Sequence, residues 1–171
     1  MKINTRKLAV AGMMTALGVV LSTFYIPVGV SKCFPVQHLL NVLAGIFLGP
    51  WYALGFSFCA ALIRNLMGTG SLLAFPGSMI GAFLCGMLYQ RVKKVPAAVA
   101  GEVIGTGIIG GILCYPVARF LMGNAEAALF TYVLPFLIST LGGSALAAIL
   151  LIALYQSKAV GVLRGMLEQP Q

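Results

Sequence analysis

A succession of long apolar runs, separated by short breaks, constrains this chain more than any other feature of its sequence. A soluble domain needs roughly 25% charged residues to form a solvated surface. Here only 8% of the residues are charged and 60% are hydrophobic. One buried core cannot absorb that much apolar surface. The sequence therefore predicts an integral membrane protein in which lipid is the solvent for most side chains.

The apolar runs have the length of membrane-spanning helices, which need about 20 residues and at least about 17. Pro27, the dipeptide Gly49-Pro50 and the basic stretch 90–94 separate several of them. The predicted helices cover residues 8–25, 36–49, 51–67, 72–89, 97–122 and 130–156. We expect residues 1–171 to form a single all-α membrane domain of about six transmembrane helices. The loop PVGVSKCFP after the first helix is predicted to be irregular, because it contains two prolines and a glycine.

The positions of the basic residues predict the orientation. With the N-terminus inside, eight of the 11 Lys and Arg residues lie at inner ends: Lys2, Arg6, Lys7, Arg91, Lys93, Lys94, Lys158 and Arg164. The other three lie at outer ends: Lys32, Arg64 and Arg119. Cytoplasmic loops of membrane proteins carry an excess of Lys and Arg, so both termini are expected in the cytoplasm. The net charge of +8 is then explained by membrane topology, and no nucleic acid partner is expected.

The sequence contains no pattern typical of an enzyme or a metal site. One histidine and three acidic residues are a poor supply of acids, bases and ligands, and the four cysteines lie far apart. Residues 105–110 match the dinucleotide fingerprint GxGxxG, but they lie in an apolar run without the strand that this motif requires. We interpret these glycines as helix-packing positions. No catalytic residue, metal or cofactor is expected, and any use of ATP requires a partner because no Walker A motif is present.

Glu102 is the acidic residue closest to the predicted membrane interior. It follows the basic pair Lys93-Lys94, so we interpret it as part of an ion pair that reaches the inner surface. On this interpretation the chain has no buried acid near the midplane, which a proton-driven carrier usually needs.

Polar and aromatic side chains are predicted to converge near the outer ends of the helices. His38 and Asn41 are three residues apart and share a helix face, with Gln37 beside them. Arg64 is expected to face the interior or the interface, because an arginine facing lipid costs about 2.5–3.5 kcal/mol on insertion scales. The candidate substrate-binding residues are Phe34, Gln37, His38, Asn41, Arg64, Asn65, Phe75, Tyr115 and Tyr132. They indicate either a pocket for a small, aromatic, polar molecule or an ordinary interfacial belt of polar and aromatic residues.

Gly12 and Ala16 are four residues apart on the first predicted helix and form a stripe of small residues. Such a stripe lets another helix approach closely. The approaching helix can belong to the same chain or to a partner, and composition does not decide between the two.

The stretch from Phe34 to Gln90 resembles the ThiW family, most specifically in FPVQHLLNVL, LGPWY and RNLMGTGSLLAFPGSMIGA. The basic residues and small residues that open the first helix add to this resemblance, which is looser over the rest of the chain. Members of this family are predicted substrate-binding (S) components of energy-coupling factor (ECF) transporters. They are assigned to the thiazole precursor of thiamin.

The resemblance implies a six-helix, multi-pass protein of the bacterial cell membrane, with its ligand near the outer surface under the first loop. Gly12 and Ala16 would dock onto a transmembrane coupling subunit, although the family more often has Ala-x-x-x-Ala at this stripe. Two ATPase subunits would supply energy, and hydroxyethylthiazole would be the substrate. The alternatives are an S component for another vitamin or heterocycle, and a non-catalytic helical membrane subunit without a ligand.

Overall fold

The computed structural model describes residues 4–28 and 31–168. The boundaries of its first helices lie at capping residues and helix breakers. Helix α1 (Thr5–Val20) begins after Asn4, whose side chain accepts a hydrogen bond from the Lys7 amide. It continues into one 3₁₀ turn, η1 (Leu21–Thr23). Helix α2 (Pro35–Phe47) has proline in its first turn, where the missing N–H costs nothing.

A sharp reversal at Gly49 joins α2 to α3 (Pro50–Leu66). Gly49 has a φ of 88°, which glycine adopts without steric penalty. Helix α4 (Ala74–Val92) ends at Lys93, which takes the left-handed conformation.

A single continuous helix spans Val95–Leu121, but its hydrogen-bonding pattern changes along its length. It consists of α5 (Val95–Glu102), the π-helical η2 (Val103–Gly110), α6 (Gly111–Pro116) and the π-helical η3 (Val117–Leu121). The change at η3 directly follows Pro116, which has no N–H to donate to the preceding turn. Helices α7 (Val133–Gln156) and α8 (Ala159–Glu168) complete the chain.

Each apolar run expected from the sequence overlaps a helix of the structure, with ends displaced by a few residues. Two elements differ from expectation. Helix α8 was not predicted. The loop after the first helix is an antiparallel hairpin of β1 (Ile26–Val28) and β2 (Ser31–Cys33), so its prediction as an irregular loop was wrong. Pro27 is tolerated because it lies in a two-stranded ribbon, where each strand has one free edge.

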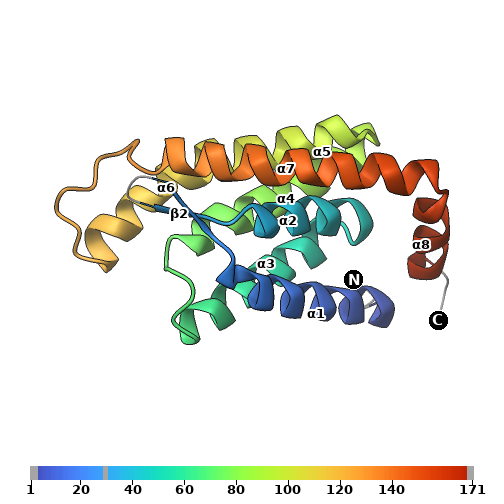
Figure 1. Ribbon diagram of the computed structural model, residues 1–171, viewed down its shortest axis with the longest axis horizontal. Coiled ribbons are helices and arrows are strands. Elements are labelled where there is room, and N and C mark those ends of the chain that lie inside the picture. The colour runs from blue at the N-terminus through green and yellow to red at the C-terminus, as the bar shows by residue number, and fades with distance from the viewer. Residues whose placement is uncertain (1–3, 29–30, 169–171) are drawn as a thin grey trace.

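The helices form a bundle elongated along one direction, with α1 and α7 on opposite sides and α2 and α4 between them (Figure 1). Helix α4 packs against α2, α3, α5 and η2, while α2 also packs against α7. The hairpin lies at one end of the long axis, and α8 lies across the other end, where both termini are found (Figure 1).

Glycines allow α4 and η2 to cross with their backbones in contact. A Cβ atom placed on Gly105 would lie 2.7 Å from the Cα of Gly81, and one on Gly110 would lie 2.7 Å from the Cα of Gly77. Neither position has room for a side chain. The interpretation of residues 105–110 as helix-packing glycines is therefore confirmed.

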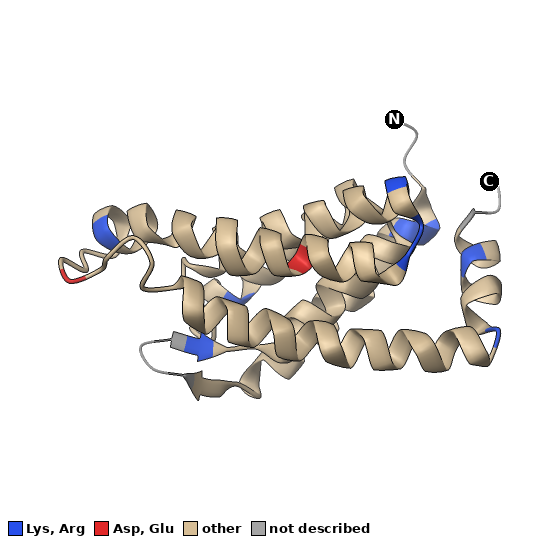
Figure 2. Cartoon of the chain, turned by 90° about the horizontal axis from the view of Figure 1, so that it is seen from above, with Lys and Arg blue, Asp and Glu red and all other residues tan. Residues whose placement is uncertain are grey.

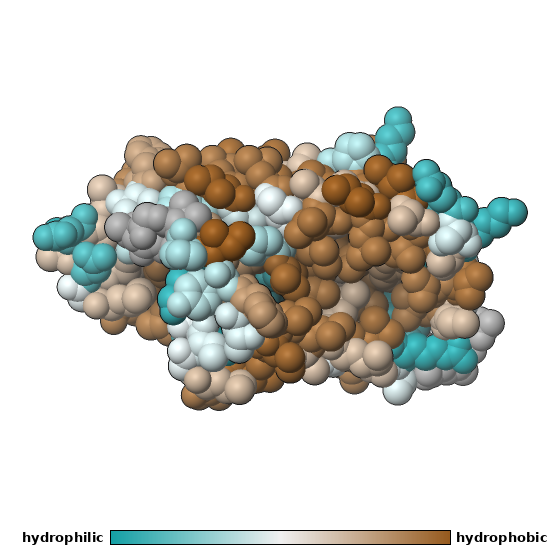
Figure 3. Space-filling model, viewed as in Figure 1, coloured by the Kyte–Doolittle hydropathy of each residue, from teal (hydrophilic) through white to brown (hydrophobic). Residues whose placement is uncertain are grey.

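In the part of the chain that the structure describes, three helical segments are long and apolar enough to cross a membrane by length and composition: Thr5–Thr23, Val95–Leu121 and Val133–Gln156. Helix α2 is also apolar, but its 13 residues extend only about 20 Å at 1.5 Å per residue. Figure 3 shows hydrophobic residues over the middle of one face of the bundle and hydrophilic residues mainly towards its two ends. This distribution is typical of a membrane protein.

Helix α8 is held against the start of α1. The side chains of Asn4 and Arg6 donate hydrogen bonds to the last carbonyls of α8, at Leu167 (2.9 Å) and Met166 (2.8 Å). Arg164 of α8 also hydrogen-bonds to the Tyr89 hydroxyl of α4. These contacts fasten the end of the chain to the end of the bundle where it begins.

Candidate functional site

A small cavity lies at the hairpin end of the bundle. The volume that the centre of a water molecule can occupy in this cavity is about 40 Å³. Its lining consists of Lys32, Phe34, Gln37, His38, Arg64, Ala74, Gly77, Ser78, Thr106, Phe136 and Ser139. The hairpin, α2, α3, α4, η2 and α7 all contribute to this lining. Such a convergence of many elements on a few polar groups is typical of a binding site for a small molecule.

The hairpin is connected to α7 beside this cavity by two polar contacts. The Phe34 amide donates a hydrogen bond to the Ser139 hydroxyl at 2.9 Å, and the Cys33 thiol points to the Pro135 carbonyl at 3.3 Å. Cys33 is a free thiol, and burial raises its pKa, although Ser139 partly opposes this shift.

A second, wider cavity of about 350 Å³ lies beside the first. The two share four lining residues: Lys32, Phe34, Ala74 and Phe136. The outer cavity is also lined by Tyr132 and by the loop residues Thr69, Gly70 and Ser71. Together the two cavities form a narrow inner chamber and a wider outer one.

A buried carboxylate, Glu102, forms the centre of a polar cluster under the inner cavity. Its side chain is fully buried. Its Oε1 lies 2.9 Å from His38 Nδ1, and it accepts hydrogen bonds of 2.9 Å from Asn41 Nδ2 and Thr106 Oγ1. The interpretation of Glu102 as part of an ion pair with Lys93 or Lys94 at the inner surface was therefore wrong. The bundle buries the acid, and three polar groups surround one of its oxygens.

Asn41 connects this carboxylate to the neighbouring helices. It is fully buried, and its Oδ1 accepts hydrogen bonds from Ser57 Oγ at 3.0 Å and Gln37 Nε2 at 3.2 Å. Its Nδ2 also contacts the Ser78 carbonyl at 3.3 Å. Asn41 thus fixes the floor of the cavity and does not belong to its lining.

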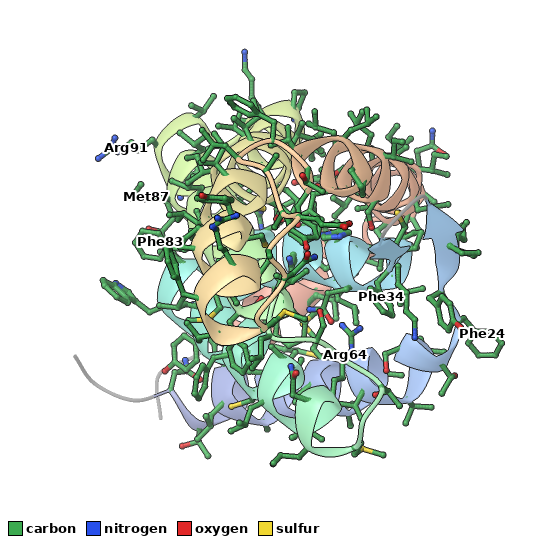
Figure 4. All side chains as sticks on the ribbon, turned by 90° about the vertical axis from the view of Figure 1, so that its left-hand side faces the viewer. Phe24, Phe34, Arg64, Phe83, Met87 and Arg91 are labelled. Atoms are coloured by element: carbon green, nitrogen blue, oxygen red, sulfur yellow. The ribbon has the colours of Figure 1, made fainter. Side chains whose placement is uncertain are left out.

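Arg64 is buried beside the cavity with only 2% of its surface exposed. Its guanidinium carbon lies 4.0 Å from the centre of the Phe34 ring, a cation–π arrangement. Figure 4 looks onto the hairpin end and shows Arg64 next to Phe34, among the helices. No carboxylate among the described residues forms a salt bridge with Arg64.

The other predicted site residues lie outside the inner cavity. Asn65 is half-buried and donates hydrogen bonds to the carbonyls of Ala61 (2.8 Å) and Ser71 (3.0 Å), so its amide ties the loop after α3. Phe75 packs against Phe58 on the side of the bundle, with ring centres 5.8 Å apart.

Tyrosines 115 and 132 pack in one cluster at the hairpin end. Tyr132 lines the outer cavity, and Tyr115 lines neither cavity. The structure therefore brings Phe34, Gln37, His38 and Arg64 together around the inner chamber.

The sequence analysis missed several residues of the site: Ser78, Glu102, Thr106, Phe136 and Ser139. A signal for Glu102 was present, because an acid within an apolar run is by default a candidate functional residue. Thr106 follows it by four positions and so lies on the same helix face. Ser78, Phe136 and Ser139 gave no such signal, since serines and phenylalanines are common in any membrane helix.

Gly12 and Ala16 lie on an exposed face of α1. A Cβ atom added to Gly12 would have no neighbour within 4 Å, so this glycine does not serve a close helix contact among the described residues. Gly12 lines an apolar groove of about 540 Å³ between α1 and α3.

The chain matches one known protein family over most of its length. A comparison with curated protein sequences gave no significant match. The model of the ThiW family, described as a thiamine-precursor transporter protein, matches residues 8–157. This match covers every helix from α1 to α7 apart from the first turn of α1, together with both cavities. The resemblance drawn from the motifs between Phe34 and Gln90 is thereby confirmed, and the chain belongs to the ThiW family of thiamine-precursor transporters.

Proposed function

We propose that this protein is the S component of an ECF-type importer and that it captures the thiazole precursor of thiamin, hydroxyethylthiazole, at the hairpin end. The observation that carries the proposal is the inner chamber lined by both aromatic and polar side chains. A thiazole ring needs an aromatic wall, and its nitrogen and hydroxyl need one or two fixed hydrogen-bonding partners. Phe34 and Phe136 offer the wall, while His38, Ser78 and Ser139 offer the partners.

In this proposal six helices cross the bacterial cell membrane with both termini in the cytoplasm: α1, α2, α3, α4, the helix Val95–Leu121 and α7. Figure 2 shows the basic residues gathered mainly at the end that carries the termini, with fewer at the hairpin end. The positive-inside rule then assigns the end with the termini to the cytoplasm and the hairpin end to the outside. The ligand site would open outward, as an importer requires.

The energy for import is proposed to come from partners: a transmembrane coupling subunit and two ATPase subunits. The coupling subunit would dock onto the face of α1 that carries Gly12 and Ala16. Both residues are exposed there, and the groove beside Gly12 is apolar and leaves room for a helix.

The test is ligand binding to the purified chain in detergent, by titration with hydroxyethylthiazole, thiamin and the pyrimidine precursor. We expect selective binding of the thiazole. Phe136→Leu should weaken it about two- to tenfold, because an aromatic contact of this kind contributes about 0.5–1.5 kcal/mol beyond its area. Phe58→Leu is the matched control, since Phe58 lines neither cavity and 42% of its surface is exposed. Absence of thiazole binding, or equal losses in the two variants, would contradict the proposal.

A further inference from the structure

The lining of the inner cavity carries positive charge without a negative charge to balance it. Lys32 and Arg64 contribute positive charges to its lining, whereas no carboxylate contributes to it. Glu102 lies below, and its Oε1 is already occupied by Asn41, His38 and Thr106. The chamber therefore presents positive groups to a ligand and has no exposed acid to balance them. A neutral ligand gives no reason for this arrangement.

Arg64 has two unused donors that form a specific shape. Nε and Nη2 are both buried and have no hydrogen-bond partner. These two N–H groups point in parallel from one edge of the planar guanidinium, which is the fork that binds the two oxygens of a carboxylate or phosphate. Phe34 covers the face of the guanidinium and leaves this edge free.

A role for the Arg64 side chain in bracing the loop does not explain these donors. The loop after α3 is tied by the backbone carbonyl of Arg64, which accepts hydrogen bonds from the amides of Thr69 and Gly70, both at 2.9 Å. The Asn65 side chain donates a further hydrogen bond to this loop, at the Ser71 carbonyl. The guanidinium itself donates no hydrogen bond that fastens the loop. An unpaired buried charge destabilises a protein, so its retention points to a group that arrives from outside.

We infer that the cargo carries a compact oxyanion, a carboxylate or a phosphate, which binds the Nε and Nη2 edge of Arg64 with Lys32 near by. The inference rests on the proposed function, because it takes the same chamber as the capture site. It replaces the neutral thiazole alcohol, as the preferred ligand of this chamber, with a small heterocycle that carries an anionic substituent. The ring would lie towards Phe136 and the anion towards α3.

The experiment compares three ligands on the full-length protein in detergent: hydroxyethylthiazole, its phosphate ester and the corresponding thiazole acetate. We expect one or both anionic ligands to bind at least about tenfold more tightly than the alcohol. The tighter of the two shows whether the site prefers a phosphate or a carboxylate. Arg64→Met should abolish the preference, and Arg64→Lys should keep part of it, because lysine retains the charge without the fork. Arg91→Met is the matched control, since Arg91 is exposed at the end of α4.

Thermal stability of the ligand-free protein separates recognition from a structural role. Arg64→Met should leave the melting temperature unchanged or raise it, because it removes a buried charge that has no partner. A fall in melting temperature larger than that of Arg91→Met would contradict the inference. Equal or tighter binding of the alcohol would overturn the inference and leave the capture function intact, whereas no binding of any of the three ligands would overturn both.

Discussion

The hydrogen-bonding role of Asn41 leads to a prediction that can be worked out from the structure. Asn41→Ala removes the Nδ2–H that donates to Glu102, and it leaves the amide of Gln37 without its acceptor. Ser57 keeps a partner, because its hydroxyl also contacts the Ser78 carbonyl at 3.4 Å. The Ser78 carbonyl, which Asn41 Nδ2 also contacts, likewise keeps the Ser57 hydroxyl. The two largest losses are therefore the bond to the Glu102 carboxyl group and the neutral bond from Gln37.

The expected cost follows from these two bonds. A hydrogen bond to a charged group contributes about 1.5–3 kcal/mol, and a neutral one between membrane helices averages about 0.6 kcal/mol. Asn41→Ala should thus lower the free energy of unfolding by about 2–3.5 kcal/mol. The matched control is Asn65→Ala, which removes an amide bonded only to two backbone carbonyls in a half-buried loop. Water can replace those bonds, so we expect a cost of about 1 kcal/mol or less there.

The assay is equilibrium unfolding in mixed micelles, with circular dichroism followed against the mole fraction of dodecyl sulfate. A difference of about 2 kcal/mol between the two variants corresponds to roughly a thirtyfold change in the unfolding constant, at 1.4 kcal/mol per factor of ten. The cost of Asn41→Ala should also shrink in a Glu102→Leu background, because the carboxyl oxygen to which Asn41 donates is then absent. Equal costs for the two asparagines, or no coupling to Glu102, would refute the assignment of Asn41 as the support of a buried carboxylate.

Three further predictions concern packing, docking and thiol chemistry. Gly105→Ala should destabilise the protein by about 1–3 kcal/mol, since the added Cβ meets the backbone of α4, whereas Gly142→Ala, with nothing within 4 Å, should be close to neutral in the same unfolding assay. If the coupling subunit docks on α1, Gly12→Leu should leave thiazole binding intact and abolish cellular uptake; normal uptake would refute that docking face. Cys33 should react with maleimide more slowly at pH 7 than a solvent-exposed thiol of ordinary pKa, because burial keeps it protonated until the pH exceeds its raised pKa; an equal rate would contradict its burial.

The sequence allowed the helices to be predicted closely, because their ends depend on local chemistry. The dipeptide Gly49-Pro50 marks the turn between α2 and α3, and the basic stretch 90–94 marks the end of α4. The hairpin escaped prediction because its strands have three residues each and one contains a proline, so no alternating pattern could develop. Helix α8 escaped because its ten residues are too few for a membrane span and include two glycines, which weaken a helical pattern.

The site was predictable only in part, for a different reason. Phe34, His38 and Arg64 could be proposed from their residue types and their positions at helix ends. Glu102 was misplaced because nearby basic residues offered an ion pair along the sequence, whereas its actual partners come from α2 and from the next turn of its own helix. Contacts between helices depend on rotations about helix axes, and one sequence does not determine these.

The hairpin has a kinetic consequence for a protein that must take up a scarce nutrient. Two polar contacts, from the Phe34 amide and the Cys33 thiol, join it to α7, while the helices beneath are held by glycine-to-glycine backbone contacts. Lifting the hairpin therefore disrupts far fewer interactions than separating the helices. If the inner chamber is the capture site, the rates of ligand capture and escape should be set by the frequency with which this hairpin opens. Strengthening the two contacts would slow both rates together and leave the equilibrium affinity almost unchanged.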